Sequence, residues 1–272
     1  MKKLLIKLSR PTLKNFPVKI TSPPKIFFCH IPKCAGSSLH SAISSQYYEP
    51  NKLGSFSIKR AVSKRTADIL EIPMMSVRET VMVHNLSIKS NYYGHGHSFC
   101  RPQVVKNFSD EWNFLTVLRN PVDRWISLYT YNTYKKSQWD RNALPLNKYI
   151  ESEVGNMAGQ AFIRYFSNFN GSCASEHIEQ ALQNLHQFSI VGTTGHLDIL
   201  TTQIAKDFDI KLDIPKINKN PNSKLSLEIK SDSKTVKKIE KVCQYDMEIY
   251  ERFTDEHGTI YSGKSRKWIS KR

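Results

Sequence analysis

A short apolar run that leads directly into a turn of small residues is the feature that most restricts how this chain can fold. The run covers residues 25–31 and is flanked by prolines, which is the pattern of a short strand buried in a parallel sheet. A helix is predicted from about Ser37, because Leu39, Ala42 and Ile43 then lie on one face. A buried strand followed at once by a helix predicts the first unit of an α/β fold.

The same order of elements recurs in the middle of the chain. Residues 113–118 predict a second buried strand, and Arg119 follows it. Asn120 and Pro121 are a favourable cap and first-turn pair for a helix. The helix that they begin has an apolar face made by residues at helical spacing: Val122, Trp125, Ile126 and Tyr129.

The C-terminal half also alternates helical and extended patterns. Amphipathic stretches predict helices at 178–185, 197–208 and 236–253, with a short strand at 188–191. Residues 213–226, rich in Asp, Pro, Asn, Lys and Ser, predict a long polar loop. The whole pattern predicts an α/β fold: a single P-loop-like domain with a central, mainly parallel sheet flanked by helices on both faces.

Positive charge is concentrated at the two ends of the chain. Of the net charge of +16, residues 1–25 carry seven Lys or Arg and residues 264–272 carry five, both without an acid, which leaves about +4 for the body. We therefore expect an irregular basic arm at 1–25, the domain at 26–256 and a basic tail at 257–272. A mildly basic body fits a local anion pocket better than a nucleic-acid groove, and no nucleic-acid-binding motif is present, so no nucleic-acid partner is predicted.

The five cysteines form no C-x-x-C pair and no zinc-like spacing, which argues against a disulfide framework and against a metal site. No apolar run reaches the roughly eighteen residues of a membrane span, and the run at residues 4–6 is too short for a signal peptide. We therefore expect a cytoplasmic protein whose basic ends suit peripheral contact with an anionic membrane.

The turn at residues 32–38 has the chemistry of an anion cradle. Backbone N–H groups of the turn and of the first helical turn converge where the helix dipole favours an anion. Lys33 adds a mobile positive charge, and Ser37 and Ser38 add hydroxyl donors. Gly36 is the turn's single glycine and the lysine precedes it, so the full Walker spacing is missing and a nucleotide triphosphatase is disfavoured.

Arg119 and Ser127 supply a second set of donors. An arginine at a strand end and a hydroxyl on the following helix can hold a second phosphate at a fixed distance from the first. Taken alone, Arg119 fits equally well an ion pair with an acid at the edge of the sheet. Arg124 is suited to the same phosphate, but beside Asp123 on a helix it is interpreted as a solvated surface residue.

Both motifs resemble those of the Golgi-type carbohydrate sulfotransferases, nearest to the uronyl and heparan sulfate 2-O-sulfotransferases. Residues 30–38 read His-Ile-Pro-Lys-Cys-Ala-Gly-Ser-Ser, like the 5′-phosphosulfate loop, and residues 119–129 read Arg-Asn-Pro-Val-Asp-Arg-Trp-Ile-Ser-Leu-Tyr, like the 3′-phosphate motif. The resemblance implies 3′-phosphoadenosine 5′-phosphosulfate as donor, 3′,5′-adenosine bisphosphate as product, and no metal. It assigns the 3′-phosphate to Arg119 and Ser127. It assigns the 5′-phosphosulfate to Lys33, Cys34, Ala35, Gly36, Ser37 and Ser38.

Residues 92–99, Tyr-Tyr-Gly-His-Gly-His-Ser-Phe, resemble the aromatic-His-Gly-His segment of the 2-O-sulfotransferases. This implies His97 as catalytic base, His95 as its orienting partner or the alternative base, and Lys33 as the group that neutralises charge on the leaving oxygen. An imidazole suits the step, because the acceptor hydroxyl must lose its proton as it attacks sulfur. Without the resemblance, His-Gly-His fits equally well a turn with hydrogen-bonded or metal-binding histidines.

Weaker matches lie in the C-terminal half. Residues 188–197 resemble the family's stretch beside the nucleotide, with Gly195 where a glutamate is usual. Residues 216–224 resemble a polar loop that closes over the nucleotide, which makes Lys219 and Lys224 candidate contacts. Residues 245–250 resemble the family's final helix.

The sequence thus predicts a sulfotransferase that moves a sulfuryl group to a hydroxyl by in-line displacement, with a carbohydrate or glycolipid as the acceptor that the resemblance implies. Two alternatives remain at this point. One is a P-loop nucleotide-dependent kinase, which needs a lysine late in the loop and a carboxylate for magnesium. The other is a non-enzymatic protein that binds nucleic acid or a glycan.

Overall fold

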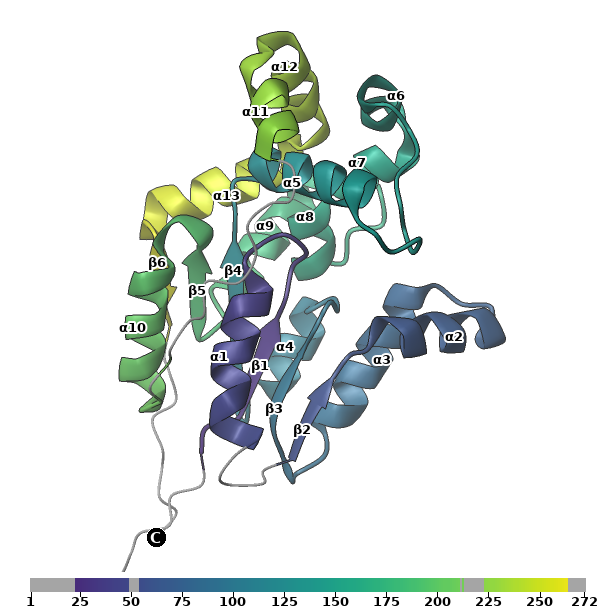
Figure 1. Ribbon diagram of the computed structural model, residues 1–272. Helices are drawn as coiled ribbons and strands as arrows, with labels where there is room; N and C mark the ends of the chain where they lie inside the picture. The colour runs from purple at the N-terminus through teal and green to yellow at the C-terminus, as the bar shows by residue number, and fades with distance from the viewer. Residues whose placement is uncertain (1–22, 49–53, 211, 213–222, 264–272) are drawn as a thin grey trace, which may run out of the picture.

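Figure 1 shows the computed structural model, which describes residues 23–48, 54–210, 212 and 223–263. Within these residues the strands are β1 (Ile26–Cys29), β2 (Gly54–Ser57), β3 (Asn91–Gly96), β4 (Asn113–Leu118), β5 (Ile190–Thr193) and β6 (Ile260–Ser262). The helices are α1 (Gly36–Tyr48), α2 (Arg60–Leu70), α3 (Met74–Leu86), α4 (Pro102–Phe108), α5 (Pro121–Tyr134), α6 (Leu146–Glu151), α7 (Glu153–Gly159), α8 (Ala161–Phe166), α9 (Ala174–Leu185), the 3-10 helix η1 (Thr194–His196), α10 (Leu197–Phe208), α11 (Ser223–Ser231), α12 (Ser233–Val242) and α13 (Gln244–His257).

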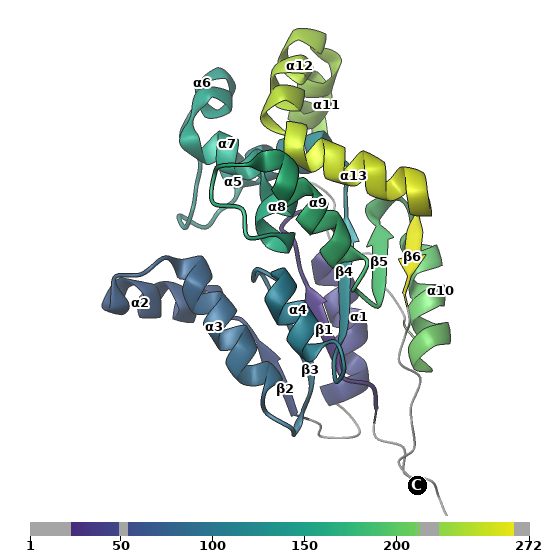
Figure 2. The same cartoon turned by 180° about the vertical axis from the view of Figure 1, so that it is seen from behind.

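The strands form one sheet in the order β2-β3-β1-β4-β5-β6, in which β6 alone is antiparallel. Helices α1 and α10 lie against one face of the sheet, and α3, α4 and α9 lie behind the other (Figures 1 and 2). Every residue of β1 and β4 is buried, as expected for central strands covered on both sides. The predicted fold class is therefore confirmed: α/β, with a mainly parallel sheet flanked by helices.

Parallel pairing brings the carboxyl ends of the central strands to one edge of the sheet. Phe28 of β1 lies opposite both His95 of β3 and Leu115 of β4, and Leu118 of β4 lies opposite Thr193 of β5. The segments that leave these strands therefore start beside one another, at the edge where open α/β sheets bind ligands. Helices α5, α6, α7, α11 and α12 lie beyond this edge (top of Figure 1).

A buried ion pair joins α5 to the C-terminal helix. The guanidinium of Arg124 lies 3.9 Å from the carboxylate of Asp246 on α13, and both side chains are almost fully buried. Asp246 also accepts hydrogen bonds from the backbone N–H groups of Phe162 (2.9 Å) and Ile163 (3.1 Å) on α8. Burial raises the pKa of Asp246 to about 6, while Arg124 and these N–H groups oppose the rise. The interpretation of Arg124 as a solvated surface residue is wrong, because its side chain is buried and paired with Asp246. The sequence does not indicate this pair, since the two residues lie far apart along the chain.

Several predicted boundaries differ from the structure. The helix expected at 236–253 is two helices, α12 and α13, which meet at Cys243, whose buried thiol donates to the Pro121 carbonyl at 3.7 Å. The predicted polar loop ends earlier, because Ile229 is buried against α5 and makes 223–231 a helix. The strand expected at 188–191 lies at 190–193.

The sheet also extends past residue 256, where the sequence predicts the domain to end, because β6 pairs with β5 after a turn at Gly258. The basic segments 1–22 and 264–272 lie outside the described residues. None of the described helices combines the length and apolar character needed to cross a bilayer.

Replacing Asp246 with alanine should destabilise the fold, because Arg124 would remain buried without its partner and two N–H groups of α8 would lose their acceptor. We expect the free energy of unfolding to fall by about 3–5 kcal/mol, measured by urea denaturation. The matched control is Glu179→Ala: this carboxylate also pairs with an arginine, Arg252, but on the surface, so the unfolding midpoint should hardly move. Equal midpoint shifts in the two variants would contradict the role given to the buried pair.

Candidate active site

The loop between β1 and α1 holds two residues in a backbone conformation that residues other than glycine rarely adopt. Lys33 has a φ of 69° and Ala35 a φ of 53°, both in the left-handed region. Such conformations persist where the surrounding structure imposes them, and they are common at functional sites. Left-handed residues gather successive backbone N–H groups on one side of a chain, and α1 adds the positive end of its helix dipole. The loop therefore has the backbone features of an anion-binding nest.

Gly36 allows the ring of His30 to pack against this loop. A Cβ atom at residue 36 would lie 1.9 Å from Cδ2 of the His30 ring, so no larger residue fits there without moving that ring. The ring of His30 stacks on Phe28 with centroids 5.5 Å apart and lies 4.3 Å from the ring of His97. Gly36 of the predicted phosphosulfate loop is thus needed because it lets the His30 ring pack directly against the loop backbone.

His97 is held by the same loop through its first ring nitrogen. Its Nδ1–H donates to the backbone carbonyl of His30, and because a carbonyl can only accept, this fixes the proton on Nδ1 and leaves the lone pair on Nε2. Burial lowers the pKa of His97, the bond to the His30 carbonyl opposes this, and the charges of Arg78 and Arg60 lower it further. The ring is therefore neutral near pH 7, with one basic nitrogen.

His95 occupies a different environment from His97. Its ring stacks on His40 of α1, with centroids 3.3 Å apart, and His40 Nδ1 shares a 2.8 Å hydrogen bond with the hydroxyl of Tyr93. Burial lowers the pKa of His95 to about 3, helped by the charges of His40 and His97. Its buried Nδ1 has no hydrogen-bond partner among the described residues. His95 is thus fixed in a stack of rings and is a much weaker base than a free imidazole.

Arg119 connects the loop to the second motif. Its Nη1 donates to the backbone carbonyl of Lys33 at 3.1 Å, and the side-chain oxygen of Asn120 caps α5 by accepting from the N–H of Asp123 at 3.2 Å. The Lys33 ammonium lies 4.0 Å above the ring of Tyr131, also on α5. Burial and the charge of Arg119 lower the pKa of Lys33, while Cys34 opposes them. The two positively charged groups of Lys33 and Arg119 thus lie where β1, β4 and α5 meet.

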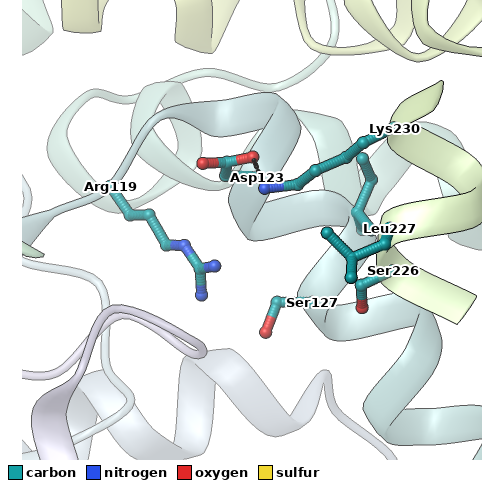
Figure 3. Close-up of a pocket in the computed structure, with 7 residues that line it drawn as sticks. Arg119, Asp123, Ser127, Ser226, Leu227 and Lys230 are labelled. Atoms are coloured by element: carbon teal, nitrogen blue, oxygen red, sulfur yellow. Dashed lines mark ion pairs between the residues drawn. The ribbon is translucent and has the colours of Figure 1, made fainter. Parts of the chain in front are cut away.

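A cavity of about 200 Å³ lies between α5 and α11, beside this junction. Figure 3 shows the guanidinium of Arg119 and the hydroxyl of Ser127 facing the same space, with Lys230 of α11 paired to Asp123 at 2.6 Å across it. Because Lys230 neutralises Asp123, the cavity keeps the positive charge of Arg119. It has the size and donors to take one phosphate group.

The structure brings most of the predicted site residues to this edge of the sheet. Residues 33–38 form the loop and the start of α1, and Arg119 and Ser127 line the cavity. His95 lies near the end of β3, and His97 directly follows this strand. The side chain of Ser37 is exposed, that of Ser38 is largely buried, and burial raises the pKa of the Cys34 thiol to about 12, which keeps it neutral. Lys219 lies outside the described residues, and Lys224 lies on α11.

Some candidate residues were not identified from the sequence. Lys230 belongs to a segment without an assigned element, although Leu225 and Ile229 are spaced as on one helical face. His40 lies on α1, whose place beside β3 depends on the sheet order, and Arg60 lies on α2, which packs against α3. Arg60 stacks on Trp139, 5.0 Å from the ring, at a pocket of about 570 Å³ that Trp139 lines with residues of α2: Ala61, Lys64, Arg65, Asp68 and Ile69.

Comparisons with solved structures find sulfotransferases of low similarity to this chain. Among solved structures, a sulfotransferase from Alicyclobacillus acidocaldarius has 16% sequence identity and a TM-score of 0.40, over 82% of this chain and 97% of that one. The mouse sulfotransferase SULT7A1, crystallised with PAP, has 13% identity and a TM-score of 0.41, over 82% of this chain and 66% of that one. No curated protein sequence matches the chain.

A family match covers most of the sequence. The profile of the Sulfotransferase family aligns with residues 17–253, which include the loop after β1, the histidine segment of β3 and the motif at the start of α5. The coarser part of the sequence-based identification is therefore confirmed. This chain belongs to the sulfotransferase family.

Proposed function

We propose that the protein transfers a sulfuryl group from 3′-phosphoadenosine 5′-phosphosulfate to a hydroxyl of an anionic carbohydrate, in the manner of the 2-O-sulfotransferases. The observation that carries the proposal is the bond from Arg119 to the Lys33 carbonyl, which sets an arginine beside an anion-binding loop. The donor has two phosphate positions, one on each side of its ribose. A loop and a cavity joined by one hydrogen bond match that pair of charges.

In this assignment the loop residues from Lys33 to Ser38 bind the 5′-phosphosulfate. Arg119 and Ser127 bind the 3′-phosphate in the cavity between α5 and α11, where Lys230 offsets the charge of Asp123. Backbone N–H groups and a lysine suit this task, because sulfuryl transfer, like phosphoryl transfer, depends mainly on positioning and on stabilising charge.

The transfer itself needs one base and one group that stabilises the leaving oxygen. The acceptor oxygen attacks sulfur as the bond between sulfur and the bridging oxygen breaks, and the bridging oxygen leaves with the electron pair on 3′,5′-adenosine bisphosphate. Lys33 neutralises that developing charge. Nε2 of His97 takes the proton of the acceptor hydroxyl, for which the fixed proton on Nδ1 leaves its lone pair ready.

His97 is favoured over His95 as the base by two differences between the rings. His97 is oriented by a backbone carbonyl, whereas His95 is stacked on the ring of His40. The pKa of His95, about 3, makes His95 a poor proton acceptor. We assign His95 to positioning, as the ring that keeps His40 and the end of β3 in place.

The proposal that the acceptor is anionic is supported by the surface that α2 and Trp139 form. Arg65 and Trp139 line the pocket of about 570 Å³, Lys64 is paired there with Asp68, and Arg60 stacks on the indole ring. Aromatic rings pack against sugar faces, and guanidinium groups pair with carboxylates or sulfates. Arg60 lowers the pKa values of both His97 and Lys135, so it lies within electrostatic reach of the proposed base. In this assignment the acceptor binds in this pocket with its reacting hydroxyl toward His97.

Arg119→Ala should weaken the binding of 3′,5′-adenosine bisphosphate roughly 10- to 150-fold, since a charge-assisted hydrogen bond contributes about 1.5–3 kcal/mol. Calorimetric titration of purified protein measures the change. Arg252→Ala, which removes an exposed arginine on α13, is the matched control and should bind normally. Tighter binding of ATP with Mg²⁺ than of the bisphosphate by the wild type would instead support the kinase alternative.

His97→Ala should lower kcat by about 10²–10⁴-fold with donor affinity retained, as expected for loss of a general base. Because the lowered pKa keeps the ring neutral, the wild-type kcat/KM should stay level as pH falls to about 6.5, the ordinary histidine value, and decline only below it. His95→Ala should keep this acid limb. An acid limb that persists unchanged in His97→Ala would show that another group is the base.

Trp139→Ala should raise KM for a uronate-containing oligosaccharide about 2- to 12-fold, the equivalent of about 0.5–1.5 kcal/mol of ring contact, with a smaller effect on kcat. Arg65→Ala should act in the same direction and more strongly at low salt. A neutral glucose oligomer should be a poor acceptor for the wild type. Equal use of the neutral and anionic oligomers would rule out the charged part of the assignment.

A further inference from the structure

Three side chains from two helices point at one another at the β6 edge of the sheet, away from the strands that carry the candidate active site. His186 follows the last turn of α9, and Glu256 and His257 lie in the last turn of α13. Figure 2 shows α9 and α13 side by side, with β6 below one end of α13. Glu256 is mostly exposed, while the two histidine rings are partly buried.

The ligand atoms of these residues have spacings close to those of a metal site. Nε2 of His186 lies 2.7 Å from Nε2 of His257, and a carboxylate oxygen of Glu256 lies 3.6 Å from the first nitrogen and 3.4 Å from the second. Two ligand atoms each about 2.05 Å from a tetrahedral ion lie about 3.3 Å apart. The two oxygen–nitrogen spacings fit this value, and the nitrogen–nitrogen spacing of 2.7 Å needs to open by about 0.6 Å.

Aromatic packing holds both imidazole rings in this arrangement. The ring of Phe253 lies 5.6 Å from that of His186 and 4.8 Å from that of His257, and the ring of Tyr261 on β6 lies 5.7 Å and 4.6 Å from the same two rings. The hydroxyl of Tyr261 donates to the backbone carbonyl of His186 at 2.8 Å. The nitrogen atoms are therefore aimed at one point before any ion binds.

We propose that His186, Glu256 and His257 form a binding site for Zn²⁺ or a similar divalent transition metal, with water at the fourth position on the exposed side. Two imidazoles and one carboxylate select this class of ion, because Mg²⁺ and Ca²⁺ prefer oxygen ligands throughout. The ion ties the end of α9 to the end of α13 and, through Tyr261, to the edge strand. The role of the ion is structural, since the transfer reaction that we propose at the carboxyl ends of β1, β3 and β4 has no step that uses it.

The competing state of these residues is a direct hydrogen bond between the two imidazoles. At 2.7 Å one Nε2 carries a proton and donates it to the other, and binding of an ion displaces that proton. The sequence gives no sign of the site, because residue 186 is separated from residues 256–257 by most of the C-terminal half.

The test is a calorimetric titration of the untagged full chain with ZnCl2, followed by thermal unfolding with and without the ion. The Cys173→Ser background removes the exposed thiol, a separate ligand for zinc. We expect one Zn²⁺ per chain, a rise in the unfolding temperature with Zn²⁺ and not with Mg²⁺, and at least about a tenfold loss of affinity in His257→Ala. His84→Ala, an exposed histidine on α3, is the matched control and should bind as the wild type does.

Glu256→Gln keeps the test valid if His257→Ala fails to fold, because this exposed side chain is not part of the aromatic packing. It should fold normally and bind Zn²⁺ more weakly. Three results would overturn the proposal: no zinc binding by the wild type at millimolar concentration, equal binding by the wild type and both variants, or bound zinc that does not raise the unfolding temperature.

Discussion

Two backbone carbonyl groups of a single loop hold the candidate active site together. The carbonyl of His30 accepts the Nδ1–H of His97, and the carbonyl of Lys33 accepts a guanidinium N–H of Arg119. Each acceptor belongs to the loop that binds the transferring group in our proposal. The positions of His97 and Arg119 therefore both depend on this loop, and a shift of the loop would move both side chains. Gly36 is part of this constraint, because the ring of His30 occupies the space that a side chain at residue 36 would need.

Burial has opposite chemical consequences for the groups around this loop. It keeps the histidines neutral, which suits a base, and it keeps the Cys34 thiol neutral, which removes it as a competing nucleophile. For Lys33 it works against the charged form, together with Arg119. The doubly charged phosphosulfate group of the proposed donor would reverse that effect, since its negative charge favours protonated lysine. An anion bound between Lys33 and Arg119 would therefore reduce the repulsion between these two positive charges.

Local sequence patterns were sufficient for the strand and helix that begin each motif. Residues 113–118 are a strand with the predicted bounds, because a mainly apolar run and an Asn-Pro cap leave few alternatives. The helix at 197–208 also has its predicted bounds. Failures arose where a partner far along the chain decides the outcome. Arg124 looks like a surface residue until Asp246 is placed beside it, and residues 223–226 look like a loop until α5 buries Ile229.

The site shows the same division between local and distant information. The loop and the Arg119 motif were found from residue type and order, because backbone donors and an arginine fork need only a few adjacent residues. The order of the strands, which places β3 beside β1, decides that His97 meets the His30 carbonyl and that His40 meets His95. Sequence patterns do not contain that order.

The buried pair of Arg124 and Asp246 also has a consequence for how the protein is made. During synthesis α5 leaves the ribosome long before α13, so Arg124 has no anionic partner until most of the chain has been translated. The helix that carries Ser127 is therefore completed by one of the last helices to emerge. A nascent chain that ends before Asp246 has the sequence of both motifs and lacks the support that holds them in register.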